Sequence, residues 1–420
     1  MKFLLSAFPI SAFPWQISAF CFLLSISSSV RAQEALRMSL ASEEAAQARR
    51  DAAQLGYCNI KFRSVTARVQ AYAGIEYIDN VTYSTTKPES DVALRAGVNI
   101  ESLWPISDLN SLYLSTGAGY IKYAQIGSAD SPYITPNSGI LFQMYSGDFL
   151  INLHDRFSLI QSGSQNSTVN SVVGYDRLQN TLGANVDWDL NDLILSAQYD
   201  HDLLMATQPA YKYVNRNSDL LSTRAMYDLN RRVSVGLEAA GGLTYYDQQR
   251  FPNNNYYSIG AASVVKLSQF LKVRLSAGWA DYTFDSTPTN SNSNLGSDQN
   301  SYYAKASIDH QLTRFISHSL TLQHNLGLGE WYAVGNLDTA SYSVTWIADA
   351  RLTVSGSFYY FTGDIYNPAK ESLTWFGPRL EVQYHLGPKL YTSLTYQYSQ
   401  SESATTYTQN RIGLNLTYTF

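Results

Sequence analysis

The chain has few groups whose types and spacing could support catalysis or metal binding. The string Asp200-His201-Asp202 contains the donors of a metal site or a proton relay, and His154-Asp155 is a shorter version. Both strings fall in segments of alternating polarity that we expect to be strands, where successive side chains point to opposite faces. His201 therefore points away from its two neighbours, and the three side chains cannot converge on one ion. We interpret both strings as structural.

Other signatures of chemistry are weak. The segment 291–298 is rich in Ser, Asn and Asp but lacks the ordered carboxylate spacing of a calcium loop, so we interpret it as a solvated loop. The sequence contains no glycine-rich phosphate loop and no recognisable nucleophile motif. Once a signal peptide is removed, only Cys58 remains, which excludes an internal disulfide. The sequence therefore predicts a protein that is not an enzyme and has no cofactor or bound metal.

Charged side chains on the polar face of the alternating segments could instead act on a solute, and we predict that they line a pore. These residues are Arg68, Glu76, Arg95, Glu101, Arg351, Arg379, Glu381 and Arg411. Over the whole polar face basic residues slightly outnumber acidic ones, which favours at most a weak preference for anions. The alternative is that the charges pair across neighbouring strands and only line a wet wall.

The segments that would position these charges follow a period of two from Val65 to the end of the chain. In 65–77, Val, Ala and Ile alternate with Thr, Arg, Gln and Glu, and 92–101 repeats the pattern. Such segments are strands with one apolar and one polar face. They exceed the five or six residues usual in a globular strand and fit the 9–11 that a tilted membrane-spanning strand needs.

The connections alternate between short turns and longer polar loops. Three turns share one string, Asp108-Leu109-Asn110, Asp189-Leu190-Asn191 and Asp228-Leu229-Asn230, and Asp and Asn favour turns. Polar stretches at 79–91, 125–138, 161–176 and 285–299 lie between the turns. Counting turns and loops predicts an all-β fold, a transmembrane antiparallel barrel of about 18 strands with both chain ends in the periplasm.

Composition is typical of such a barrel. The 32 Tyr, 7 Trp and 17 Phe stand beside only 15% charged residues, and barrels place aromatic rings in girdles at both membrane interfaces. The net charge of −5 argues against a nucleic-acid partner, which would need clustered basic charge.

The N-terminus predicts export. Lys2 is followed by an apolar core, 17–26, and small residues that place a cleavage site after Ala32, so residues 1–32 resemble a secretory signal peptide. Residues 33–64 form an N-terminal extension whose Ala-rich part, 34–55, predicts a helix ending at Gly56. This helix is either a periplasmic extension or a plug in the lumen, and the barrel follows over 65–420.

The last strand carries a more specific signal. It ends the chain on Phe420, with Tyr418 and Leu416 continuing the lipid-facing alternation. We predict that these three residues form the signal by which the barrel-assembly machinery recognises the protein.

Two stretches resemble the beta-barrel porin 2 family. The first reads IEYIDNVTYS, continues to Ser90-Asp91 and then reads VALRAGVNIESLW; the second is the terminal TQNRIGLNLTYTF. The resemblance implies an outer-membrane barrel, in some cases associated with exopolysaccharide export, without a catalytic residue set. Asp79 and Asn80 match the family motif, and the simplest role for them is to shape the turn at the end of a strand.

We therefore expect a water-filled, weakly selective, passive diffusion pore in the outer membrane of a Gram-negative cell. One alternative is a barrel for polysaccharide export that works with periplasmic partners. Another is a non-conducting surface scaffold. The expected partners are outer-membrane lipid and the assembly machinery.

Overall fold

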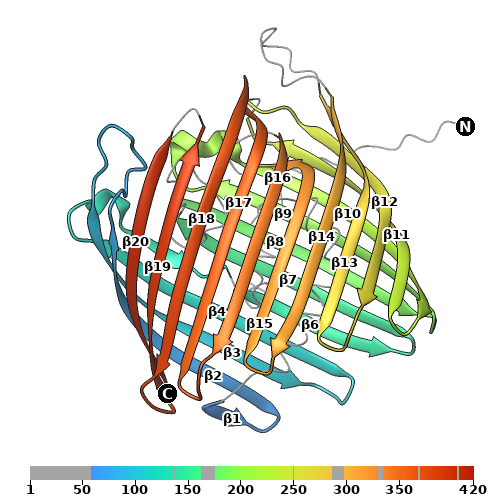
Figure 1. Ribbon diagram of the computed structural model, residues 1–420, viewed down its shortest axis with the longest axis horizontal. Coiled ribbons are helices and arrows are strands. Elements are labelled where there is room, and N and C mark those ends of the chain that lie inside the picture. The colour runs from blue at the N-terminus through green and yellow to red at the C-terminus, as the bar shows by residue number, and fades with distance from the viewer. Residues whose placement is uncertain are drawn as a thin grey trace, which may run out of the picture.

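The computed structural model describes residues 58–136, 138–161, 176–248, 250–285, 298–329, 334–367, 369–403 and 406–420. One antiparallel sheet curls until its first long strand pairs with its last, which closes a barrel (Figure 1). The predicted signal peptide and the predicted helix at 34–55 lie outside the described residues.

The wall has 18 strand positions, as predicted, and two short strands share one of them. The strands are β2 (Val65–Ile78), β3 (Asp91–Pro105), β4 (Asn110–Tyr123), β5 (Ser131–Ile134) with β6 (Gly139–Ser146), β7 (Phe149–Gln161), β8 (Asp176–Asp189), β9 (Leu193–Ala206), β10 (Arg216–Asn230), β11 (Val233–Tyr246), β12 (Asn254–Lys266), β13 (Leu271–Phe284), β14 (Gln299–Thr313), β15 (Ile316–Leu328), β16 (Val334–Ile347), β17 (Leu352–Asn367), β18 (Ala369–His385), β19 (Leu390–Glu402) and β20 (Tyr407–Thr419).

Short turns close one end of the barrel and longer connections the other, as predicted. One predicted loop, 125–138, needs correction, because β5 and η1 (Gly127–Ala129) both lie within it. β5 is only four residues long, which is too short to show an alternating pattern in the sequence. It pairs with the loop end of β4, and β6 pairs with the turn end of the same strand, so the two pieces form one interrupted wall strand.

The closure between β2 and β20 runs from the pair Gln70–Thr419 to the pair Ile78–Arg411. Below it, a short strand, β1 (Ile60–Phe62), pairs with the first residues of β2 and takes the place that a longer β20 would occupy. The Asn59 side chain accepts from the Val69 N–H (2.9 Å) and donates to the Val69 carbonyl (3.2 Å). The last residues of the predicted N-terminal extension therefore form part of the sheet.

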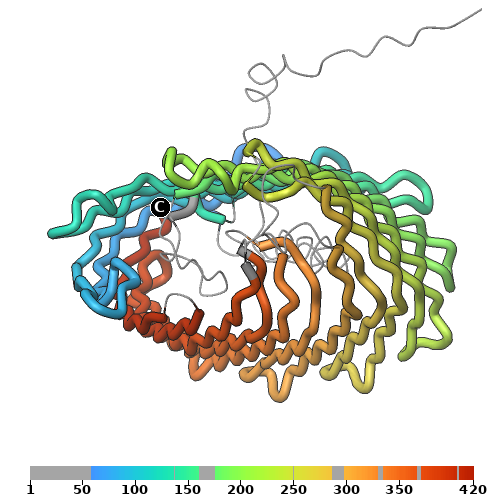
Figure 2. Tube along the Cα trace, turned by 90° about the horizontal axis from the view of Figure 1, so that it is seen from above, coloured from blue at the N-terminus to red at the C-terminus, as the bar shows by residue number. Residues whose placement is uncertain are grey.

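The outer surface is mostly apolar, and aromatic side chains gather near the strand ends. Figure 2 shows the wall from above as a closed, flattened ring. Exposed Trp104, Trp188 and Trp346 lie at the turn end, and Tyr77 and Tyr245 lie at the loop end, with exposed Leu, Ile and Val between them. This exterior fits an apolar membrane core between two interfaces, so the chain is a transmembrane barrel of the cell outer membrane. Within the described part of the chain, no helix has the length and apolarity needed to cross a membrane.

Candidate functional site

The inner face at the loop end is filled by apolar side chains from many strands, which we call the loop-end core. Its buried members are Leu204, Ala206, Val214, Leu220, Phe251, Tyr256, Ala280, Tyr282, Phe284, Leu326, Leu328 and Val334. The short helix η2 (Pro209–Val214) and the β11–β12 loop contribute Val214 and Phe251. Tyr366 of β17 packs against both halves of the core, so it joins strands that lie far apart along the wall.

Polar contacts fix the loops that form this core. The Arg250 guanidinium lies 4.0 Å from the centre of the Tyr213 ring, and the edge of Phe251 meets the Tyr213 ring at 5.8 Å between centroids. The Arg216 guanidinium of β10 donates to the carbonyl of Gly329, which follows β15. These contacts hold the connections inward, over the inner face of β9–β17.

Asp79 and Asn80, the two residues that match the porin 2 motif, bind the loop between β2 and β3 to β20. The Asp79 carboxylate accepts from the Asn410 backbone N–H and from its Nδ2, both at 2.7 Å. The Asn80 Nδ2 donates to the Thr408 carbonyl (3.0 Å), and Gln409 Nε2 donates to the Asn80 carbonyl (2.6 Å). The pair does more than shape a turn, because it ties the two ends of the barrel sequence together.

The same loop carries a ring into the inner face. Tyr83 meets Tyr407 of β20 edge to face, with 5.1 Å between centroids. Burial raises the pKa of the Tyr83 phenol above its ordinary value, so this side chain stays neutral.

Below this loop lies a polar cavity of about 370 Å³, which we call the polar pocket. It lies against one continuous stretch of the wall, which runs from β18 through β20 and the paired β2 to β5. Its lining includes Tyr72, Glu76, Arg95, Asn99, Arg379, Glu381, Gln383, Gln397, Arg411 and Asn415. Five of the eight predicted pore-lining residues therefore meet here, although they come from both ends of the sequence.

Glu76 is the centre of the charge network in this pocket. It lies on β2 between β3 and β20, and the register places Arg95 and Arg411 diagonally on either side. Both guanidinium groups donate to Glu76 Oε2, at 2.5 Å from Arg95 and 3.1 Å from Arg411. The Arg411 side chain is only 5% exposed and that of Glu76 is 16% exposed, so the carboxylate is essential for compensating the buried arginine.

The remaining predicted residues differ in their surroundings. Arg379 donates to Glu381, two residues along the same strand, at 2.8 Å, and both side chains are about one-third exposed. Arg68 and Glu101 are register partners on β2 and β3 and form an ion pair nearer the turn end. Arg351 lies in the turn before β17 and is exposed, so it does not join the polar pocket.

Tyrosines on the inner face lie along the wall over glycines of neighbouring strands. The Tyr72 and Tyr133 hydroxyls meet at 2.5 Å, across β3 and β4. Tyr303 crosses two strands to donate to Glu238 of β11 at 2.9 Å, and a Cβ at Gly260 would collide with its phenol. These rings therefore lie against the wall of the barrel, above the neighbouring strands. Sequence reasoning missed this arrangement, although glycines at inward positions were its visible signal.

The two suspected metal strings do not form metal sites. Asp200 points inward and meets His154 of β7, with Nε2 2.7 Å from Oδ1, whereas His201 meets Asp219 of β10 at 2.8 Å. The prediction that His201 points away from its neighbours is confirmed.

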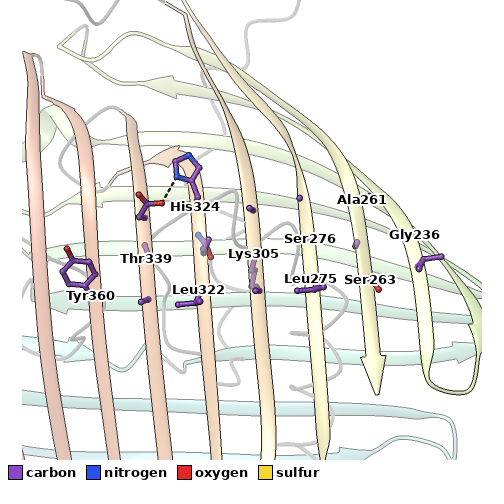
Figure 3. Close-up of a pocket in the computed structure, with 18 residues that line it drawn as sticks. Gly236, Ala261, Ser263, Leu275, Ser276, Lys305, Leu322, His324, Thr339 and Tyr360 are labelled. Atoms are coloured by element: carbon purple, nitrogen blue, oxygen red, sulfur yellow. Dashed lines mark hydrogen bonds and ion pairs between the residues drawn. The ribbon is translucent and has the colours of Figure 1, made fainter. Parts of the chain in front are cut away.

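A larger recess, of about 860 Å³, lies on the front wall (Figure 3). Alternation places most of its lining on the outer face, including Ala261, Leu275, Ala304 and Leu322. At its upper edge, His324 Nδ1 lies 2.8 Å from a carboxylate oxygen of Asp338. Because this recess faces the hydrocarbon of the membrane, it lies away from any path through the barrel.

The end of the chain lies on the outer face. Leu416, Tyr418 and Phe420 are about half exposed there, and the rings of Tyr418 and Phe420 meet edge to face at 5.4 Å. The Phe420 N–H donates to the Val69 carbonyl (3.2 Å), so the final residue still belongs to the closure between β2 and β20.

No family model matches the sequence, and no curated protein is detectably similar to it. Among solved structures, it is similar to Pseudomonas aeruginosa OpdK with vanillate, at 10% identity and a TM-score of 0.45, over 84% of this chain and 99% of that one. It is also similar to P. aeruginosa OccK2 (OpdF) in complex with glucuronate, at 9% identity and a TM-score of 0.47, over 84% and 98%. Acinetobacter baumannii OccAB3 matches at 10% identity and a TM-score of 0.45, over 84% and 99%. These are distant likenesses, and the barrel architecture of this chain rests on its own strand pairings.

Proposed function

We propose that the protein is a passive outer-membrane pore through which small polar solutes diffuse. The polar pocket is the observation that carries this proposal. Ionised side chains and amides gather on the inner face, and such groups are stable away from lipid only with partners or water around them. A barrel of 18 strands is also wider than its own side chains can fill.

The proposed pore is weakly selective. Arg95 and Arg411 share Glu76, and Arg379 is paired with Glu381, so three arginines face two glutamates and the net positive charge of this network is small. Charge rings confer selectivity when one sign dominates, which is not the arrangement here.

The test is conductance of the purified, folded protein in a planar lipid bilayer. We expect an ohmic current and a small reversal potential across a potassium chloride gradient. Heat-modifiable migration on gels would verify that the barrel is folded. A closed trace from folded protein would overturn the pore and favour the export or scaffold alternatives.

We also propose that Phe420, Tyr418 and Leu416 are read by the assembly machinery. Their exposed position on the outer face of the closing strand supports this role. Deleting Phe420, or changing it to Ser, should lower the amount of folded barrel in the membrane, whereas Phe420→Tyr should preserve it. Wild-type levels of folded barrel in the deletion would overturn the proposal.

A further inference from the structure

Two histidines meet on the outer wall beside the β14–β15 turn. His310 and His318 are register partners on these antiparallel strands. His310 Nδ1 lies 3.0 Å from His318 Nε2, and the two rings are inclined by 75° with centroids 5.0 Å apart. One ring nitrogen of each histidine is therefore directed at the other.

We propose that this pair binds a divalent transition-metal ion such as Zn²⁺, Ni²⁺ or Cu²⁺. Imidazole nitrogens bind zinc at about 2.0–2.1 Å, so two of them on one tetrahedral ion lie roughly 3.3 Å apart. The observed separation is close to that value and would need only a small movement of the rings. Imidazole suits these ions and not Mg²⁺ or Ca²⁺, which prefer oxygen ligands.

The tautomers of the pair can adjust to the ion. A ligating histidine presents a bare nitrogen to the metal and carries its proton on the other ring nitrogen. Nδ1 of His318 is buried and makes no hydrogen bond within the described structure. To bind the metal through Nε2, the nitrogen that faces His310, the His318 ring must carry its proton on Nδ1. No described neighbour donates a hydrogen bond to Nδ1, so this tautomer is not blocked.

The location gives the ion access to water. Alternation directs both histidines outward, because Asp309 and Ser319 beside them face the lumen, and both rings are partly exposed. Tyr342 lies against His318, with 5.9 Å between ring centroids, and Phe315 marks the adjacent turn. Aromatic residues at strand ends mark the membrane interface, so periplasmic ions can reach the site.

The protein supplies two ligands, and water would complete the coordination. Among the described residues, no group of three or more His, Cys, Asp or Glu side chains could hold a metal together. A bound ion would link β14 to β15 next to their turn and hold that hairpin closed.

The test is calorimetric titration of the folded, chelator-treated protein in detergent with Zn²⁺ and Ni²⁺, with Mg²⁺ for comparison. We expect one Zn²⁺ per barrel and no Mg²⁺ binding. His310→Gln and His318→Gln should each weaken Zn²⁺ binding by at least about tenfold, because even outer-shell partners of a metal contribute 10–100-fold to affinity. His385→Gln, which changes a histidine at the same end of the barrel, should leave it unchanged.

Cu²⁺ electron paramagnetic resonance supplies a second readout, since two coordinated imidazoles give nitrogen hyperfine structure that each variant should reduce. Heat-modifiable migration would show that the variants remain folded. Absence of Zn²⁺ binding, or equal binding by the wild type and both variants, would overturn the proposal.

Discussion

The polar pocket and the loop-end core occupy the same inner face, yet they are built from opposite chemistry. In the pocket, Glu76 compensates Arg95 and Arg411 around a cavity of about 370 Å³. In the loop-end core, Phe251 and Val214 are 2% and 1% exposed and pack against the strand ends. In both regions, every second side chain of a strand faces the inside of the barrel.

The difference shows that the inner face of a barrel is not uniformly a pore lining. Where connections fold inward, apolar packing holds them in place, because burial of apolar surface is stabilising and does not depend on the direction of individual contacts. In the polar pocket, each arginine is bonded to a carboxylate, and Arg95 and Arg411 share one, because a partly buried ionised group needs compensation. The following substitutions test this division, in order of decreasing effect.

The largest effect is expected for Phe251→Ala in the loop-end core. Truncating a buried Phe typically costs about 3–5 kcal/mol, so the β11–β12 loop should detach from the wall. Limited proteolysis within 247–253 should accelerate, and open-channel noise should rise. Phe315→Ala, at an exposed turn, is the control and should change neither. Equal protease resistance of the wild type and Phe251→Ala would show that the core does not hold the loop.

Glu76→Gln should have the next largest effect, because it removes the charge that compensates Arg411. Breaking a fully buried pair costs about 3–5 kcal/mol, and we expect about 2–4 kcal/mol here, since the wet pocket solvates part of the charge. The unfolding midpoint in denaturant should fall. In the control, Glu381→Gln, the arginine partner is 34% exposed, so the midpoint should fall less. An equal loss for the two variants would contradict this ranking.

Gly260→Ala should act through the wall tyrosine. A Cβ there collides with the phenol of Tyr303, so the ring must leave the wall and its bond to Glu238. Overpacking typically costs about 1–3 kcal/mol, and a ring displaced into the lumen should lower single-channel conductance. Gly241→Ala is the control, because the nearest atom to its Cβ would be the Tyr256 carbonyl oxygen at 3.6 Å. Unchanged conductance in Gly260→Ala would show that the ring position does not limit the path.

Arg379→Glu should have the smallest effect on stability, about 1 kcal/mol or less, because the pair with Glu381 is partly exposed. It places a second acidic side chain beside Glu381 in the polar pocket and removes one positive charge, so the reversal potential in a salt gradient should shift toward cation selectivity. Arg351→Glu, in the exposed turn, should shift it less. A larger shift from Arg351→Glu would mean that the polar pocket is not the selective part of the path.

Most of the barrel could be predicted from sequence, because each strand repeats a local rule. The alternation from Val65 to Phe420 identified the strands and their faces, since neighbouring side chains of a strand cannot share a face. Turn strings such as Asp189-Leu190-Asn191 marked the short connections. β5 was not predicted, because its four residues are too few to show an alternation of apolar and polar side chains.

Alternation also indicated that Arg95, Arg379 and Arg411 share one face of the sheet, but not that they share a cavity. Which strands become neighbours depends on closure between β2 and β20, which joins residues separated by more than three hundred positions. The sequence analysis did not single out His310 and His318, which lie on the two strands of one hairpin. Their contact depends on register across a turn, and one shifted residue would send either ring into the lumen.

The sequence by itself determined the strands, their inward and outward faces and the apolar belt, because these follow from backbone geometry and the membrane as solvent. Only the tertiary structure decided which inward charges compensate one another, where loops fill the lumen and where Tyr72 and Tyr303 lie. Those features depend on distances between strands that are remote in the chain, and such distances are fixed only when the sheet closes.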